Sequence, residues 1–197
     1  MPDLFKSIEQ PILSRLENEL DPRLGYHNLS HTLDVLEQAE ILARQENVND
    51  EHDLLLLKTA AVFHDSGFLF VYKGHEERGC EIASESLRNI FSNADIEKIC
   101  GMIMATKIPQ TPNTLLEQII CDADLDYLGR NDFEPISKHL YKEFITFKII
   151  SEDSIWDHIQ INFFEMHHYF THTSIRKRNG EKLKHLKILK ERSNWAQ

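Results

Sequence analysis

The sequence predicts an all-α protein that folds as one helical domain covering residues 1–197. Only 7 of its residues are glycine and 6 are proline, which is too few for the turns that many short strands require. Leu, Ile, Glu, Lys and Ala recur in long uninterrupted runs, as they do in helices, and no segment has a convincing strand pattern. With 41% hydrophobic and 27% charged residues, the chain can bury one sizeable core.

Apolar spacing and capping residues place the expected helices in order along the chain. Apolar residues recur at helical spacing from Phe5 to Leu20, where Pro11 is expected to kink or restart the first helix. Asn28 and Asp50 are typical N-caps of the next two helices. The helices expected after the first cover about residues 28–47, 50–67 (stopped by Gly67), 74–91, 93–106, 114–123, 132–147, 153–173 and 178–192.

A nearly uninterrupted apolar run at 54–63 predicts a helix that passes through the core, because it has almost no polar face. His64 and Asp65 follow this run directly, and His64 continues its apolar stripe. A buried carboxylate without a partner costs several kcal/mol or becomes neutral. Asp65 therefore predicts either a bound cation or dense hydrogen bonding where this helix ends.

Two more polar residues fall on apolar helix faces, where His31 shares a face with Val35 and Asp124 shares one with Ile120. Two imidazoles and two carboxylates directed into one core suit Mn, Fe, Co, Ni or Zn better than Mg. Taken singly, each residue also has a plain structural interpretation. His31 would be a hydrogen-bonded core residue, Asp65 a turn residue and Asp124 a cap of the next segment.

Three motifs occur in order along the chain: Tyr-His-Asn-Leu-Ser-His at 26–31, His-Asp at 64–65, and Cys-Asp-Ala-Asp-Leu-Asp-Tyr-Leu-Gly at 121–129. Together they resemble the HD superfamily of metal-dependent phosphohydrolases over about residues 24–130. The resemblance implies an HD-domain helical bundle with a metal site in its core. It also implies a C-terminal helical extension, about residues 131–197, packed against that bundle.

The resemblance also implies which residues hold the metal. In the superfamily a histidine, the His-Asp pair and a distal aspartate bind the ion. These map to His31, His64, Asp65 and Asp124, and Asp122 is the competing choice for the last ligand.

One divalent ion is expected rather than two. Relatives with two metals usually add histidines after the His-Asp pair, often near the end of the helix before the distal aspartate. Here that helix ends at residues 102–107 without a histidine, and His75 is the only histidine between the pair and Asp124. The same observation disfavours diiron oxygenases and two-metal cyclic-nucleotide phosphodiesterases.

Residues 156–171 are similar to a bacterial branch of predicted HD phosphohydrolases. Gln160 and His167 share a helical face there with aromatic residues. This pattern suits the lining of a substrate pocket and a core stripe equally well.

The resemblance implies a phosphomonoesterase or phosphodiesterase in which metal-bound water attacks a small phosphorylated substrate, a nucleotide or another metabolite. Residues 66–69 lack the glutamate that some single-metal relatives carry there, so His75, Glu76 and His27 are the candidates for proton transfer. The alternative is a non-catalytic HD domain that binds a nucleotide or alarmone as a regulatory module. The candidates for substrate binding are Arg78, Lys107, Tyr127, Arg130, Gln160 and His167.

The net charge of −10 argues against nucleic acid and anionic membranes as partners, because both repel an acidic protein. Cys80, Cys100 and Cys121 form an odd set without a Cys-x-x-Cys pair, which favours reduced core thiols. No stretch reaches the ~18 consecutive apolar residues of a membrane span, and no export signal is evident. A cytoplasmic protein is therefore expected.

Overall fold

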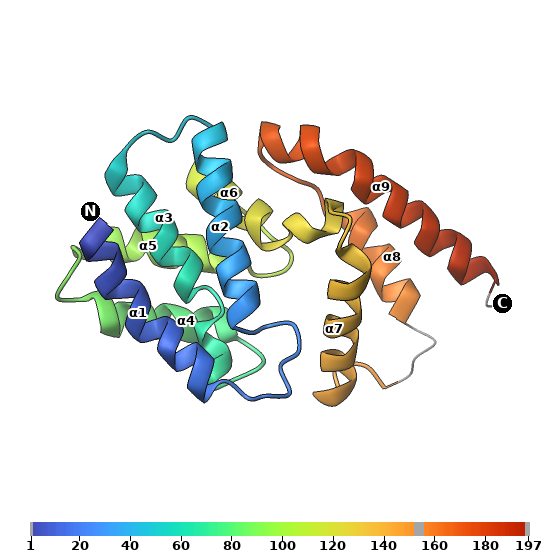
Figure 1. The fold of residues 1–197 in the computed structure, drawn as a ribbon, viewed down its shortest axis with the longest axis horizontal. Coiled ribbons are helices and arrows are strands. Elements are labelled where there is room, and N and C mark those ends of the chain that lie inside the picture. The colour runs from blue at the N-terminus through green and yellow to red at the C-terminus, as the bar shows by residue number, and fades with distance from the viewer. Residues whose placement is uncertain (1, 152–155, 196–197) are drawn as a thin grey trace.

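The structure, a computed structural model, describes residues 2–151 and 156–195 (Figure 1). It confirms the all-α prediction, because every regular element in those ranges is helical. None of the described helices is both long and apolar enough to cross a bilayer. The elements are α1 (Pro2–Glu19), α2 (Leu29–Gln45), α3 (Glu51–Phe63), η1 (Ser66–Leu69), α4 (His75–Leu87), α5 (Asn93–Ala105), α6 (Leu115–Asp124), η2 (Asp126–Gly129), α7 (Phe133–Thr146), α8 (Trp156–Met166) and α9 (His172–Trp195), where η denotes a 3-10 helix.

Helices α1–α6 with η1 form an N-terminal half that packs around one aliphatic core. The central helix α3 contacts α1, α2, α4, α5 and α6, as expected for a helix that is apolar on all sides. Its residues Leu56, Leu57 and Val62 are fully buried. Burying side chains of this size stabilises a fold by about 1.5–3 kcal/mol each, so this core provides the larger share of the apolar stabilisation.

Helices α7–α9 with η2 form a C-terminal half, which has a second and smaller core. This core is aromatic at its centre, where the ring centroid of Phe133 lies 5.1 Å from that of Phe164 and 6.2 Å from that of Tyr127. Leu128 and Leu189 are almost fully buried beside these rings. Figure 1 shows α7–α9 on the side of the molecule away from α1, and η2 joins the two halves.

Side-chain caps fix several helix starts where the sequence predicted them. The side chain of Asn28 accepts hydrogen bonds from the backbone N–H groups of Ser30 and His31, at 2.9 and 3.2 Å. Asp50 caps α3, and Thr114 caps α6, in the same manner. The cap of α2 matters for function, because it orients the first turn that carries His31.

The helix predicted to run to Gly67 ends earlier, at Phe63, and the chain then tightens into η1. Gly67 is nevertheless required where it lies, because a Cβ atom there would come within 1.9 Å of the backbone oxygen of His75. The glycine therefore lets η1 contact the start of α4 directly. The first helix does not restart at Pro11, because α1 continues through this residue.

The helix predicted over 153–173 is wrong at its C-terminal end, and its predicted start lies outside the described residues. α8 ends at Met166, and α9 begins at His172, earlier than predicted. The physical cause is a cap: Thr171 Oγ1 accepts the backbone N–H of Ser174 at 3.2 Å and so starts a new helix. The hydrophobic pattern alone did not reveal this interruption.

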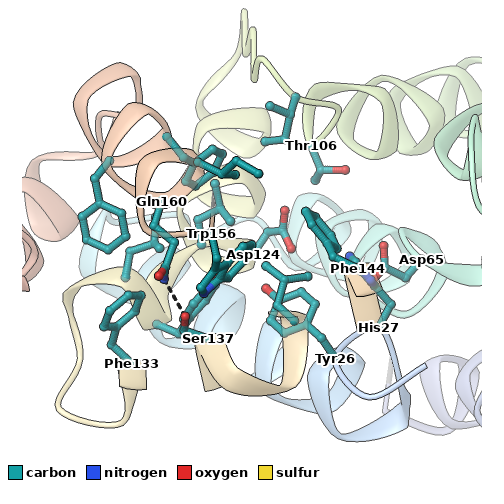
Figure 2. Close-up of a pocket in the computed structure, with 18 of the residues that line it drawn as sticks. Tyr26, His27, Asp65, Thr106, Asp124, Phe133, Ser137, Phe144, Trp156 and Gln160 are labelled. Carbon is teal, nitrogen blue, oxygen red and sulfur yellow. Dashed lines mark hydrogen bonds between the residues drawn. The ribbon is translucent and has the colours of Figure 1, made fainter. Parts of the chain in front are cut away.

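A cavity of about 190 Å³ lies between the two halves (Figure 2). Polar residues of the N-terminal half form one end, and mainly apolar residues of α7 and α8 form the other. The assignment of residues 1–197 to one domain stays a prediction, although both halves share this cavity. The cavity is lined by Tyr26, His27, Asp65, His75, Glu76, Thr106, Ile108, Asp124, Leu125, Tyr127, Leu128, Phe133, Ser137, Leu140, Phe144, Trp156, Ile159, Gln160, Phe163 and Phe164.

Candidate active site

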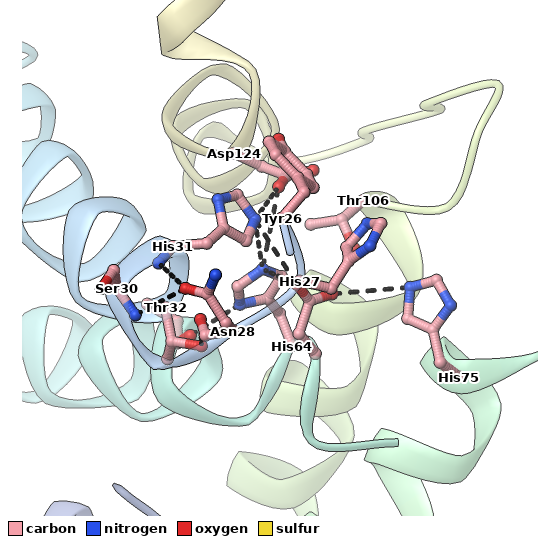
Figure 3. Close-up of polar contacts among 12 residues, drawn as sticks. Tyr26, His27, Asn28, Ser30, His31, Thr32, His64, His75, Thr106 and Asp124 are labelled. Carbon is pink, nitrogen blue, oxygen red and sulfur yellow. Dashed lines mark hydrogen bonds and ion pairs between the residues drawn. The ribbon is translucent and has the colours of Figure 1, made fainter. Parts of the chain in front are cut away.

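Three helix ends bring the expected metal ligands together at the polar end of the cavity (Figure 3). His31 lies in the first turn of α2. His64 and Asp65 follow the last residue of α3, and Asp124 is the last residue of α6. Helix ends suit such a site, because side chains leave the packed interior there without interrupting the apolar surfaces between helices.

The potential ligand atoms lie close enough to share one ion. His31 Nε2 is 3.4 Å from His64 Nε2 and 3.4 Å from Asp65 Oδ2, and His64 Nε2 is 3.2 Å from Asp65 Oδ2. The ligand atoms of these three residues all lie within 4.8 Å of one another. Asp124 Oδ1 lies beside both histidines, 3.2 Å from Nε2 of His31 and 3.7 Å from Nε2 of His64.

Two observations show that this set fits a divalent metal. His64 Nδ1 donates a hydrogen bond to the carbonyl oxygen of Ala61 at 2.7 Å, which leaves Nε2 to face the carboxylates. A backbone contact of this kind orients metal-binding histidines. Asp65 Oδ2 is buried and accepts no hydrogen bond among the described residues. A buried carboxylate oxygen of this kind favours a bound cation.

The electrostatics of the site favour positive charge. Burial alone would lower the pKa of His64, but the carboxylates of Asp65 and Asp124 outweigh it and raise the pKa to about 9. Burial alone would raise the pKa of Asp65, but the neighbouring His64 holds this pKa well below its usual range. The pocket therefore stabilises a cation, whether a proton on the imidazole or a metal ion.

The geometry favours Asp124 over Asp122 as the distal ligand. Asp122 lies on a different face of α6, where its oxygens accept hydrogen bonds from the backbone N–H groups of Phe170 and Thr171 at 2.9 and 2.8 Å. The Thr171 hydroxyl adds a third bond at 2.7 Å. Asp122 thus connects α6 to the turn before α9, and its oxygens are already occupied.

Two of the expected proton-transfer residues lie next to the candidate ligands. His75 Nε2 is 3.5 Å from Asp65 Oδ1 and 3.5 Å from Glu76 Oε1, and His75 and Glu76 both line the cavity. The ring of Phe68 packs against both imidazoles, with centroid distances of 4.0 Å to His75 and 4.3 Å to His27. This stack holds both histidine rings at the cavity.

Glu143, a buried residue of α7 that sequence reasoning missed, holds the third candidate, His27. Its carboxylate lies 2.5 Å from His27 Nδ1 and accepts the backbone N–H of Tyr26 at 2.8 Å and the Tyr72 hydroxyl at 2.9 Å. Burial would lower the pKa of His27, but the hydrogen bond to Glu143 raises it. Glu143 shares a helical face with Leu140, so the pattern that selected the candidate metal ligands could also have selected it.

The expected substrate-binding residues divide into two groups. Tyr127 and Gln160 line the cavity. The three cations and His167 are not among the residues that line it. The cations have closer acidic partners: Arg78 pairs with Glu81, Lys107 with Glu77, and Arg130 with Asp34 and Asp132. His167 lies beyond the new helix boundary, because it follows the last residue of α8.

A comparison with protein families agrees with this geometry. The family model of the HD domain matches residues 28–126, about half of the chain, and this range contains His31, His64, Asp65 and Asp124. Members of this family bind divalent metals. No curated protein and no solved structure matches the chain. The chain belongs to the HD superfamily of metal-dependent phosphohydrolases.

Proposed function

We propose that the protein is an enzyme that hydrolyses a phosphate ester of a small metabolite with the help of one divalent ion. His31, His64, Asp65 and Asp124 would hold that ion. The observation that carries the proposal is the buried Asp65 Oδ2, which has no hydrogen-bond partner among the described residues and lies 3.2 Å from His64 Nε2 beside an open cavity. The mixed nitrogen and oxygen donor set suits Mn, Fe, Co, Ni or Zn.

A divalent ion at this site supplies Lewis-acid activation of water and of the phosphoryl group. The chain's own residues provide proton transfer and orientation. His75 lines the cavity with Nε2 beside Asp65, so it can hold a proton at that atom and deliver it to the departing alcohol oxygen. Glu76 Oε1 lies at the same distance from Nε2 and stabilises the imidazole when it is charged.

His27 has a different part in this proposal. Its Nδ1 is committed to Glu143, so only Nε2 can reach a ligand, and the raised pKa favours the charged ring. A charged imidazole that lines the cavity complements an anionic phosphoryl group. We therefore assign His27 to binding of the phosphoryl group and His75 to proton transfer.

The test compares the wild type with Asp65→Asn. Each protein is loaded separately with Mn, Fe, Co, Ni or Zn, and its bound metal and its release of phosphate or alcohol from phosphate mono- and diesters are measured. We expect Asp65→Asn to lower metal affinity by about 100-fold or more, because loss of a ligand costs at least as much as loss of an outer hydrogen-bond partner. Activity should fall with it.

Asp53→Asn is the matched control, because Asp53 lies in the first turn of α3, at the opposite end of the helix from Asp65. It should keep both metal and activity. The proposal is overturned if no ester is cleaved with any of these ions, or if Asp65→Asn retains both properties. Binding of a nucleotide without turnover would instead support the regulatory alternative.

A further inference from the structure

We propose that the apolar end of the cavity binds an uncharged apolar group of about the size of one aromatic ring. We call this end the apolar chamber, and define it by Leu128, Phe133, Leu140, Phe144, Trp156 and Phe164. In the substrate this group would be the alcohol portion of the phosphate ester, a step that rests on the proposed function. The protein would then act on aryl or alkyl phosphates rather than on nucleotides.

The first argument is charge. Among the described residues that line the cavity there is no lysine or arginine, and the basic side chains are His27 and His75 at the metal end. Asp65, Glu76 and Asp124 are acidic residues of that same end. A nucleoside di- or triphosphate carries several charges that proteins neutralise with arginine or lysine. The cavity therefore suits one phosphoryl group with an uncharged body behind it.

The second argument is size and composition. An apolar cavity of about 150 Å³ is large enough to bind benzene. The whole cavity here, including its metal end, measures about 190 Å³, so the chamber holds no more than one such ring. Aromatic side chains form much of the chamber, and Figure 2 shows Phe133, Phe144 and Trp156 around it. Such surfaces bind flat apolar groups through burial and ring contacts. A polar ribose would lose hydrogen bonds to water there without replacement.

The third argument is an unpaired polar atom of Gln160, a residue that lines the cavity. Gln160 is 6% exposed, and its Nε2 donates to Ser137 Oγ at 2.5 Å. Its Oε1 is buried without a hydrogen-bond partner among the described residues. A buried unpaired acceptor costs free energy that a ligand donor would recover. The apolar group should therefore carry one hydroxyl or N–H group at the end far from the phosphoryl group.

The first experiment measures binding without metal or turnover. Trp156 and Trp195 are the two tryptophans of the chain, so Trp195→Phe leaves Trp156 as the only reporter of the chamber. We expect benzyl alcohol to change its fluorescence saturably and glycerol to leave it unchanged. Leu140→Asn should weaken benzyl alcohol binding about tenfold by placing an amide in the chamber, whereas Ile145→Asn, at an exposed position of α7, should not.

Gln160→Leu tests the polar contact separately. Wild type should bind 4-hydroxybenzyl alcohol more tightly than benzyl alcohol, and Gln160→Leu should remove that preference. An absent preference in the wild type would overturn this part of the proposal. Unsaturable binding of benzyl alcohol, or equal effects of Leu140→Asn and Ile145→Asn in folded proteins, would overturn the chamber itself.

The second experiment compares kcat/KM for benzyl phosphate, glycerol phosphate and adenosine monophosphate with the metal-loaded enzyme. A preference for benzyl phosphate that Leu140→Asn reduces supports the proposal, and equal or better turnover of the polar esters overturns it. If no ester is cleaved but benzyl alcohol still binds saturably, the chamber stands and the proposed hydrolase function fails. The two failures are thereby distinguishable.

Discussion

The N-terminal half and the C-terminal half of the molecule each bury the ring nitrogens of a histidine, in opposite electrostatic environments. His64 lies between Asp65 and Asp124, which raise its pKa to about 9 against the effect of burial. His167 has no hydrogen-bond partner at either ring nitrogen among the described residues. Burial and the charge of Lys182 lower its pKa to about 3. The first environment attracts a cation, and the second disfavours a positive charge on the imidazole.

This difference separates two tasks between the two halves. The N-terminal half converges buried imidazoles and carboxylates on one point, which is what metal binding requires. The C-terminal half contributes the aromatic surface of the cavity and the carboxylate of Glu143, which orients His27. Chemistry would then depend on the N-terminal half and selectivity on the C-terminal half. Asp122 and Glu143 are the buried carboxylates that connect them.

The largest effect is expected for Asp122→Ala, which removes one of these connections. The variant removes the acceptor of three hydrogen bonds, which come from the backbone N–H of Phe170, the backbone N–H of Thr171 and the Thr171 hydroxyl. We expect a loss of about 3–5 kcal/mol in the free energy of unfolding, measured by chemical denaturation. Asp132→Ala, which breaks a surface ion pair with Arg130, should cost less than about 1 kcal/mol. Equal costs would show that the halves are not joined through Asp122.

Gly67→Ala tests the contact between η1 and α4 within the N-terminal half. The added Cβ would collide with the backbone of His75, which cannot move without shifting the start of α4. We expect about 1–3 kcal/mol of destabilisation and, because His75 is displaced, a fall in hydrolysis of about 100-fold. Bound metal should remain, since the four proposed ligands are untouched. Unchanged hydrolysis in the folded variant would exclude His75 from proton transfer.

The depressed pKa of His167 predicts that acid destabilises the C-terminal half. Its folded pKa of about 3 lies below the ordinary value of 6.5, so between these values the unfolded chain takes up a proton that the folded protein does not. The contribution of the neutral, buried His167 ring to the free energy of unfolding is complete above pH 6.5 and is lost as the pH falls below this value. From pH 7 to pH 5 the wild type should lose about 1–2 kcal/mol more than His167→Phe in denaturant unfolding. The same pH dependence in both proteins would contradict this assignment.

Local sequence patterns selected four candidate ligands that the structure places close together, because periodicity reveals which helix face is buried. His31 and Asp124 were identified by sharing faces with apolar residues, and the structure places them 3.2 Å apart. The same reasoning could not decide between Asp122 and Asp124, since both are largely buried. That choice depends on hydrogen bonds from Phe170 and Thr171, which lie far along the chain.

Long-range pairing also explains what the sequence did not predict. Arg130 follows the metal motif closely, yet it pairs with Asp34, 96 residues away in sequence, at 2.8 Å. The apolar pattern continues through the turn before α9, where tertiary hydrogen bonds to Asp122 and the Thr171 cap end one helix and begin another. Lys107 likewise pairs with a residue distant in sequence, Glu77. Charges near a motif in sequence therefore say little about charges near the site.

The smallest effect is expected for Gly180→Ala, and it tests whether the C-terminal half unfolds with the rest of the molecule. Gly180 lies inside α9, and a Cβ there would meet nothing within 4 Å, so alanine fits without strain. It should stabilise the helix by about 0.5–1 kcal/mol by lowering the entropy of the unfolded chain. A higher free energy of global unfolding would show that the two halves unfold as one cooperative unit. A gain confined to slower amide exchange in α9 would show that the C-terminal half opens separately, and a loss of stability would contradict the prediction.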